Sequence, residues 1–214
     1  MKVGILGTGV VGTALGRGFI ALGHEVKLGG REANNPKAVA WAKESGTKAS
    51  AGAFADVASF GEVLVLATLG SATESALKQA GVESFKGKLV IDTTNPLDFS
   101  TGKPQLSMGH TTSLGELVQR TLPGAKVVKA FNTVGNAHMF KPTFPGGPPT
   151  MFVGGNDAGA KKQLEGILKD FGWEMADLGG IEASRWLEPM CMAWVAYAMV
   201  NGGTWNHAFK LLKK

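Results

Sequence analysis

The chain has 214 residues, 44% of them hydrophobic and 18% charged, which is enough apolar sequence for a folded core and excludes a disordered protein. The formal net charge of +5 suits an anionic small molecule, but the basic residues are scattered and form no recognition motif, so nucleic-acid binding is not expected. The single cysteine, Cys191, excludes an internal disulfide and favours the cytoplasm, and its apolar surroundings indicate a buried, inert thiol.

Strand and helix patterns alternate along the first part of the chain. Short apolar runs predict strands at 3–6, 25–28, 47–50, 62–68, 88–96 and 126–132. Stretches of helical periodicity predict helices at 10–22, 34–45, 54–61, 71–80 and 113–122. Such alternation builds βαβ units and a parallel sheet with helices on both faces.

The second part continues with a loop over 138–149 that holds four prolines and passes over the surface or closes on a ligand. Strands are expected at 150–155 and 174–180 around a helix at 157–171, and 182–212 is expected to be mostly helical. The predicted fold is α/β, a Rossmann-type doubly wound, mainly parallel sheet over 1–180 with a small C-terminal helical part over 181–214. The start of the chain does not resemble a signal peptide, and the apolar run 189–200 is too short for a bilayer, so no membrane association is expected.

A glycine-spaced turn, Gly7-x-Gly9-x-x-Gly12, follows the first strand and opens the first helix. In that context Gly7 permits the tight turn, Gly9 lets the backbone approach a pyrophosphate, and Gly12 lets the helix pack on the strand. The free N–H groups near residues 8–11 would bind phosphate oxygens. The first region therefore predicts a dinucleotide-binding domain.

The end of the second strand predicts which dinucleotide binds. An NAD site commonly places an acidic residue there, whereas this chain has Gly29, Gly30 and Arg31. Arg31 can make a two-pronged contact with a 2′-phosphate, and Lys37 could add a second positive charge. Glu32 could turn toward the ribose, and Arg31 could be a solvated surface charge. The pattern favours NADP.

Two further strands end in polar residues, at Thr68 and at Asn95. Ligands of open α/β sheets lie outside the carboxyl ends of the strands, so Asn95 could hold the nicotinamide ribose or amide. An ordinary Asn-Pro turn is the alternative interpretation.

The whole chain resembles the family of NADP oxidoreductases that depend on the deazaflavin coenzyme F420, whose relatives include the reductase domain of membrane metalloreductases. The resemblance rests on "GILGTGVVGTALG", "GHEVKLGGRE", "VIDTTNPL", "KAFNTVG", "FVGGNDAGAKKQLEGIL" and "EASRWLEPMCMAW…HAFKLL". It implies hydride transfer between NADP(H) and a planar ring. By position it assigns the phosphates to Thr8, Val10, Val11, Arg31 and Lys37, and the nicotinamide and ring pocket to Thr68, Asn95, Asn132, Thr133, Val134 and Gly135. Gly30 stands where relatives often have serine, and the segment "FKPTFPGGPP" departs from the family.

Hydride transfer between two cofactors needs little side-chain chemistry, so no catalytic acid or base and no metal site is expected. The first alternative is an NADP dehydrogenase or reductase of a small carbonyl or imine compound, which would need Lys129 or His138 as its acid. The second is a non-catalytic module that senses NADPH. His138 could also touch the second ring, but a surface or structural role is the favoured interpretation for both His138 and His110.

The apolar residues of 189–200 occupy nearly every face of the predicted helix. A helix on the surface of one core shows a polar stripe, so this segment should be buried on more than one side. A second subunit is the simplest cover, and a homodimer is expected, with burial under the proline-rich loop 141–149 as the alternative.

Overall fold

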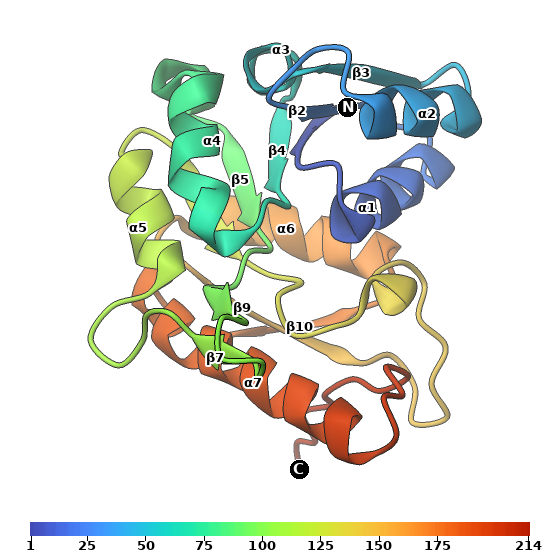
Figure 1. The fold of residues 1–214 in the computed structure, drawn as a ribbon. Coiled ribbons are helices and arrows are strands. Elements are labelled where there is room, and N and C mark those ends of the chain that lie inside the picture. Colours follow the sequence, from blue (N-terminus) through green and yellow to red (C-terminus); the bar gives the residue numbers. More distant parts are fainter.

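An eight-stranded sheet forms the centre of the molecule in the computed structural model, which describes residues 1–214 (Figure 1). Its strands are β1 (Lys2–Leu6), β2 (Glu25–Gly30), β3 (Ala49–Ala53), β4 (Val63–Leu66), β5 (Leu89–Asp92), β8 (Lys126–Lys129), β9 (Thr150–Gly155) and β10 (Glu174–Asp177). The order is β10-β9-β8-β5-β4-β1-β2-β3. Every neighbouring pair is parallel except β8 and β9, which are antiparallel. The predicted α/β fold with a mainly parallel sheet is confirmed.

Helices cover both faces of this sheet and create two hydrophobic cores. Helices α1 (Val10–Ala21), α2 (Pro36–Ser45) and α6 (Ala158–Asp170) contribute to a core of 25 buried residues. Helices α3 (Phe54–Phe60), α4 (Thr73–Ala80) and α5 (Leu114–Thr121) contribute to a second core of 16. Because both faces are covered, the inner strands are continuous apolar runs, and all four residues of β4 are buried.

Short single-turn segments and one long helix complete the chain. The 3₁₀ turns are η1 (Gly70–Ala72), η2 (Val82–Phe85), η3 (Asn136–His138) and η4 (Ile181–Ala183). Helix α7 (Ser184–Val200) lies at the end of the molecule away from α2 and β3 (Figure 1). None of the helices combines the length and the apolar character that crossing a bilayer requires.

Several elements differ from the sequence-based expectation, and the strands expected at 88–96 and 174–180 end early, at Asp92 and Asp177. The third strand lies at 49–53 rather than 47–50, because Gly46 has a φ of +86° and the chain turns before the strand starts. The strand expected at 126–132 ends at Lys129, because Phe131 adopts a left-handed φ of +59°. A small antiparallel hairpin, β6 (Leu97–Asp98) with β7 (Gln105–Leu106), was not expected, since two-residue strands leave no periodic signal.

The expectation that 182–212 is mostly helical is wrong beyond Val200. Gly202 and Gly203, with φ of +72° and +74°, reverse the chain after α7. The tail that follows has no regular secondary structure, and its hydrogen bonds go to other segments. Thr150 N donates to Phe209 O at 2.9 Å, and Trp194 Nε1 donates to His207 O at 3.0 Å. The C-terminal part is thus one helix with an extended tail.

Candidate functional site

The glycine loop between β1 and α1 has the geometry that its spacing predicts. Gly7 has a φ of +126°, and a Cβ atom there would lie 2.2 Å from Ala67 O. A Cβ at Gly12 would lie 2.2 Å from Gly7 O, so only glycine lets α1 approach the loop this closely. A Cβ at Gly9 would meet no atom of the chain within 4 Å. Gly9 therefore borders open space, into which a ligand can approach the backbone.

Helix α1 also begins without a side chain that satisfies its first amides. The N-cap residue of α1 is Gly9, which has no side chain to accept from the first amides of the helix. In contrast, the N-cap residues Asn35, Ser113 and Asp157 accept hydrogen bonds from the first amides of α2, α5 and α6. The first N–H groups of a helix have no partner within the helix, and the helix dipole makes this end attractive to anions. The start of α1 can therefore bind phosphate oxygens.

A groove of about 760 Å³ runs from the start of α1 across the ends of β2 and β4. We call it the glycine-loop groove. It is lined by Gly7, Thr8, Gly9, Val10, Val11, Gly30, Arg31, Asn35, Lys37, Phe54, Ala67, Thr68, Leu69, Ala72, Ser75, Ala76 and Gln79. The structure thus brings together nine of the predicted site residues, while Gly12 is buried beneath the loop.

The groove carries positive charge and no negative charge. Arg31 and Lys37 are its only charged lining residues, and Glu32 is exposed and does not line it. Gly30 is buried, and a Cβ there would lie 3.2 Å from the Asn35 side-chain amide. Asn35 itself caps α2 through Lys37 N and Ala38 N. The end of β2 is therefore compact, cationic and suited to a phosphate rather than to a ribose hydroxyl.

A second cavity of about 480 Å³ adjoins the groove and shares Val11, Ala67, Thr68 and Leu69 with it. We call it the hairpin pocket, because β6 and its flanking residues form one wall. Its other lining residues are Gly70, Ser71, Thr93, Thr94, Asn95, Leu97, Asp98, Phe99 and Ser107. Leu69 and Phe99 are 79% and 62% exposed, so they offer apolar surface to a ligand at the mouth.

Asp98 is the only ionisable residue that lines the hairpin pocket. Gln105 Nε2 donates to its carboxylate at 2.9 Å, as do Ser100 N and Ser100 Oγ. These hydrogen bonds lower the pKa of the Asp98 carboxyl below its ordinary value, Gln105 having the largest effect. Asp98 is therefore a carboxylate at neutral pH and cannot donate a proton there.

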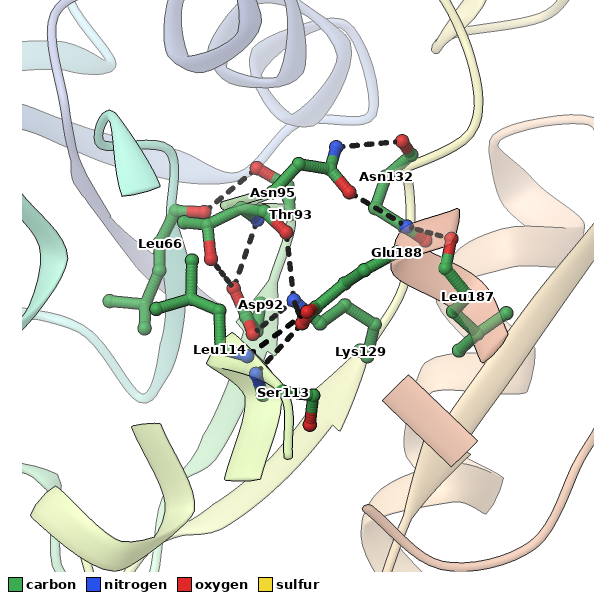
Figure 2. A network of polar contacts seen from close by, with 12 residues as sticks. Leu66, Asp92, Thr93, Asn95, Ser113, Leu114, Lys129, Asn132, Leu187 and Glu188 are labelled. Carbon is green, nitrogen blue, oxygen red and sulfur yellow. Dashed lines mark hydrogen bonds and ion pairs between the residues drawn. The ribbon is translucent and has the colours of Figure 1, made fainter. Parts of the chain in front are cut away.

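Asn95 is held by a reciprocal amide pair with Asn132. Asn95 Nδ2 donates to Asn132 O at 2.9 Å, and Asn132 Nδ2 donates to Asn95 Oδ1 at 3.0 Å and to Leu187 O at 2.8 Å (Figure 2). Asn95 lines the hairpin pocket, but Asn132 is only 4% exposed and lies behind it. The pair links the end of β5 to the turn after β8 and to α7.

The rest of the predicted segment 132–135 is also largely buried. Thr133 and Val134 are 4% and 7% exposed, and a Cβ at Gly135 would lie 3.3 Å from the Trp194 ring. None of these residues lines the glycine-loop groove or the hairpin pocket. Their expected contact with the nicotinamide stays a prediction, and their visible role is to join β8 to α7.

Figure 2 shows a buried ion network, which contacts the hairpin pocket through the pocket-lining residue Thr94. Lys129 Nζ is 2.8 Å from Asp92 Oδ2, 2.9 Å from Glu188 Oε1 and 2.7 Å from Thr94 O. Lys129 and Asp92 are paired across β8 and β5, and Glu188 reaches them from α7. Burial alone lowers the pKa of the Lys129 ammonium, but the Asp92 and Glu188 carboxylates outweigh it and raise that pKa above its ordinary value.

Lys129 and His138, the two candidate acids for a carbonyl or imine reductase, do not lie where they could protonate a substrate in either cavity. Lys129 is fully buried and three oxygen atoms surround its ammonium group, so it has no access to a substrate. His138 Nε2 lies 3.1 Å from Asn206 Oδ1, and its ring packs on Phe144 with centroids 5.0 Å apart. His138 lines neither the groove nor the hairpin pocket.

Sequence reasoning missed the hairpin wall and the ion network. Residues 97–99 belong to a strand of two residues and to an exposed turn, which no periodicity reveals. Asp92 and Lys129 do leave a signal, because each is a charged residue at the end of an otherwise apolar strand. Their pairing requires the strand order, and Glu188 comes from a helix about sixty residues further along the chain.

A Rossmann-type sheet with a glycine loop, a cationic groove and an adjoining pocket defines the class of dinucleotide-binding proteins. The family model for coenzyme F420-dependent NADP oxidoreductases matches residues 2–96. A crystal structure from Arthrobacter sp. FB24, described as a candidate F420-dependent NADP reductase, is 41% identical, covers 100% of both chains and has a TM-score of 0.93. The chain belongs to the family of F420-dependent NADP oxidoreductases.

Two curated relatives are similar over shorter stretches. The F420-dependent NADP reductase of Methanocaldococcus jannaschii is 35% identical over 136 residues, which is 62% of this chain and 60% of the relative. Metalloreductase STEAP3 of Rattus norvegicus is 28% identical over 188 residues, which is 87% of this chain and 36% of the relative. The matches thus span between about a third and three fifths of these relatives. Family membership implies a protein that binds NADP for redox chemistry.

Proposed function

We propose that the protein transfers a hydride between NADP(H) and the deazaflavin ring of coenzyme F420 or a related flavin-type ring. The observation that carries the proposal is the pair of adjoining cavities, one lined by Arg31 and Lys37 beside the start of α1, the other apolar at its mouth and poor in ionisable groups. The family membership and the name of the Methanocaldococcus relative point to the same partner.

In this proposal the glycine-loop groove holds the dinucleotide. Amides at the start of α1 bind the pyrophosphate, and Arg31 with Lys37 binds the 2′-phosphate. Gly9 fits this role, because the space beside it is open and a side chain would fill it. Thr68 lies where the groove meets the hairpin pocket, so it would flank the end of the dinucleotide that reacts.

The hairpin pocket would hold the reacting rings. When bound, NADPH supplies the hydride, with its two electrons, to the acceptor ring. The protein must then align two rings and exclude water, which needs no acid or base from the chain. This matches a pocket whose only ionisable residue, Asp98, is held as a carboxylate. The burial of Lys129 argues against the alternative of a carbonyl or imine reductase.

An acceptor panel tests the proposal. NADPH oxidation is followed with F420, a flavin, a quinone and several carbonyl and imine compounds, with Gly9→Ala as a control that impairs the dinucleotide site. We expect F420 to react fastest and the control to react slowly with every acceptor. Faster reaction with a flavin, quinone or carbonyl compound contradicts the proposed partner. NADPH binding without turnover of any acceptor would instead favour a sensor.

We infer in addition that the protein is a homodimer paired through α7. Trp186, Tyr197, Met199 and Val200 are between 54% and 81% exposed, so the proline-rich loop and the tail leave most of this apolar surface uncovered, although His207 of the tail packs on Tyr197. Light scattering at micromolar concentration should give the dimer mass, and Val200→Glu should lower it. Trp194 is unsuitable for this test, because it is 7% exposed and hydrogen-bonded within its own chain. A monomer mass for the unmodified protein contradicts the inference.

A further inference from the structure

The peptide that joins Thr94 to Asn95 connects the buried ion network to the hairpin pocket. Its carbonyl oxygen, Thr94 O, accepts a hydrogen bond of 2.7 Å from Lys129 Nζ. Its N–H belongs to Asn95, which lines the hairpin pocket together with Thr93 and Thr94. One peptide group therefore has a buried cation on its carbonyl side and the pocket-lining Asn95 on its amide side.

The N–H group of Asn95 has no acceptor within the chain. All peptide bonds of the chain are trans, so this N–H points in the direction opposite to Thr94 O and hence away from Lys129. Asn95 is half-buried, and an unpaired N–H in such a position costs free energy unless a ligand or water accepts from it. The Asn95 N–H is thus an unpaired donor on a residue that lines the hairpin pocket.

The position of this donor is fixed from three sides. Asp92 Oδ1 accepts from Thr94 N at 2.9 Å and from Thr94 Oγ1 at 2.6 Å. Thr93 Oγ1 donates to Leu66 O at 2.8 Å. The reciprocal amide pair with Asn132 holds the Asn95 side chain. The turn 93–95 cannot shift when a ligand binds without breaking these hydrogen bonds, so the Asn95 N–H is preorganised.

The network is arranged so that the charge on Lys129 persists. Glu188 accepts hydrogen bonds from Leu114 N at 3.0 Å and from Gly115 N at 2.9 Å, which places its carboxylate at the start of α5. That helix end stabilises a negative charge, and the carboxylates of Glu188 and Asp92 in turn stabilise the ammonium group. In a medium of low dielectric constant, hydrogen bonds in a chain polarise one another, so a cation on Thr94 O strengthens the Asn95 N–H as a donor.

We propose that Lys129 is a positioning residue for hydride transfer. It holds and polarises the Thr94–Asn95 peptide, so that Asn95 N–H donates a hydrogen bond to a carbonyl oxygen that is conjugated to a reacting ring. This rests on the proposed function. This oxygen belongs either to the carboxamide of the nicotinamide or to the second ring. As the hydride moves, the ring that donates it loses electron density and the ring that accepts it gains electron density. A fixed donor at such an oxygen stabilises the transition state.

The variant that tests this role is Lys129→Met with Asp92→Asn. The pair removes the ammonium without leaving the Asp92 carboxylate unpaired, and asparagine Oδ1 can still accept from Thr94 N. The matched control is Arg185→Met, because Arg185 joins α7 to α5 through Glu116 at 2.8 Å without touching Thr94. A contact that anchors α7 to the rest of the fold is removed in both variants, at Glu188 in the first and at Glu116 in the control.

Single-turnover and steady-state rates with NADPH and NADPH deuterated at the transferred position provide the kinetic readout. Loss of one preorganised donor lowers kcat about 10²–10³-fold, and here the donor remains but is less polarised, so we expect about a tenfold loss. The KM for NADPH should change less than about threefold, because the phosphate contacts lie elsewhere. The deuterium isotope effect on kcat should rise in the double variant and stay unchanged in the control.

Amide NMR of the unmodified protein provides a readout that does not depend on turnover. The Asn95 N–H resonance should move downfield when a carbonyl oxygen accepts from it. A shift with NADP⁺ alone assigns the nicotinamide carboxamide, and a shift only after F420 is added assigns the second ring. The shift should be smaller in the double variant.

The outcomes separate this inference from the proposed function. If the unmodified protein transfers a hydride but the double variant keeps kcat and the isotope effect within twofold, the role of Lys129 is refuted and the function stands. If no acceptor turns over, the proposed function fails. If the amides of Thr8 and Gly9 respond to NADP⁺ and F420 while the Asn95 amide does not, the donor assignment is refuted whatever the kinetics show.

Discussion

Two alanine substitutions in the glycine loop should separate ligand binding from folding. A Cβ at Gly9 meets no atom of the chain within 4 Å, and the backbone there has an ordinary extended conformation. Gly9→Ala should therefore change the free energy of unfolding by less than about 1 kcal/mol. The methyl group occupies the space through which a pyrophosphate approaches. Loss of one charged hydrogen bond costs about 1.5–3 kcal/mol, so NADPH should bind about 10- to 150-fold more weakly.

Gly12→Ala should, in contrast, destabilise the fold. Its Cβ would lie 2.2 Å from Gly7 O and 3.3 Å from Ile5 Cγ2, so α1 must move away from β1. Overpacking of this kind costs about 1–3 kcal/mol, which lowers the Tm of a chain of this size by about 2–12 °C. Thermal unfolding and NADPH fluorescence titration measure both effects. Unchanged NADPH affinity in Gly9→Ala would refute the assignment of this loop to the pyrophosphate.

The remaining predictions concern a thiol and an ion pair. Burial raises the pKa of the Cys191 thiol to about 11. Iodoacetamide should therefore alkylate the folded protein at least about 100-fold more slowly than the urea-unfolded chain. Similar alkylation rates would contradict the burial of this thiol. The hydrogen bond from Arg185 lowers the pKa of Glu116, so the pair stabilises the fold above the ordinary pKa of 4.5 and loses this effect as pH falls through the folded value. The difference in urea midpoint between the unmodified protein and Arg185→Met should accordingly shrink as the pH falls from 4.5 through the folded pKa of Glu116. A difference that does not change with pH would contradict a stabilising Arg185–Glu116 pair.

The first half of the fold could be predicted because its local signals agree. The glycine loop, the apolar strands and the N-cap of α2 at Asn35 each favour the same βαβ arrangement. The prediction failed where tertiary contacts decide the backbone. Phe131 ends β8 with a left-handed conformation that packing against Phe171 and Trp173 holds in place. After Gly203 the tail forms no helix, and the backbone carbonyl groups of His207 and Phe209 accept hydrogen bonds from α7 and β9.

Most of the site residues that could be predicted belong to the first βαβ unit, and Lys37, Thr68 and Asn95 are predicted lining residues outside it. Gly7, Gly9 and Arg31 belong to one βαβ unit, and the structure places all three in the glycine-loop groove. The hairpin pocket draws on residues that follow different strands, and its hairpin wall carries no periodic pattern. The ion network depends on the order of β5 and β8 and on a carboxylate from α7, so it requires knowledge of the tertiary structure.

Parallel titrations with NADPH and NADH test the central claim most directly. The groove holds Arg31 and Lys37 and has no acidic lining residue, so NADPH should bind at least about tenfold more tightly than NADH. Arg31→Ala should weaken NADPH binding about 10- to 150-fold and change NADH binding little, because only NADPH carries the 2′-phosphate. Equal affinities in the unmodified protein, or equal losses for both dinucleotides in the variant, would contradict the account.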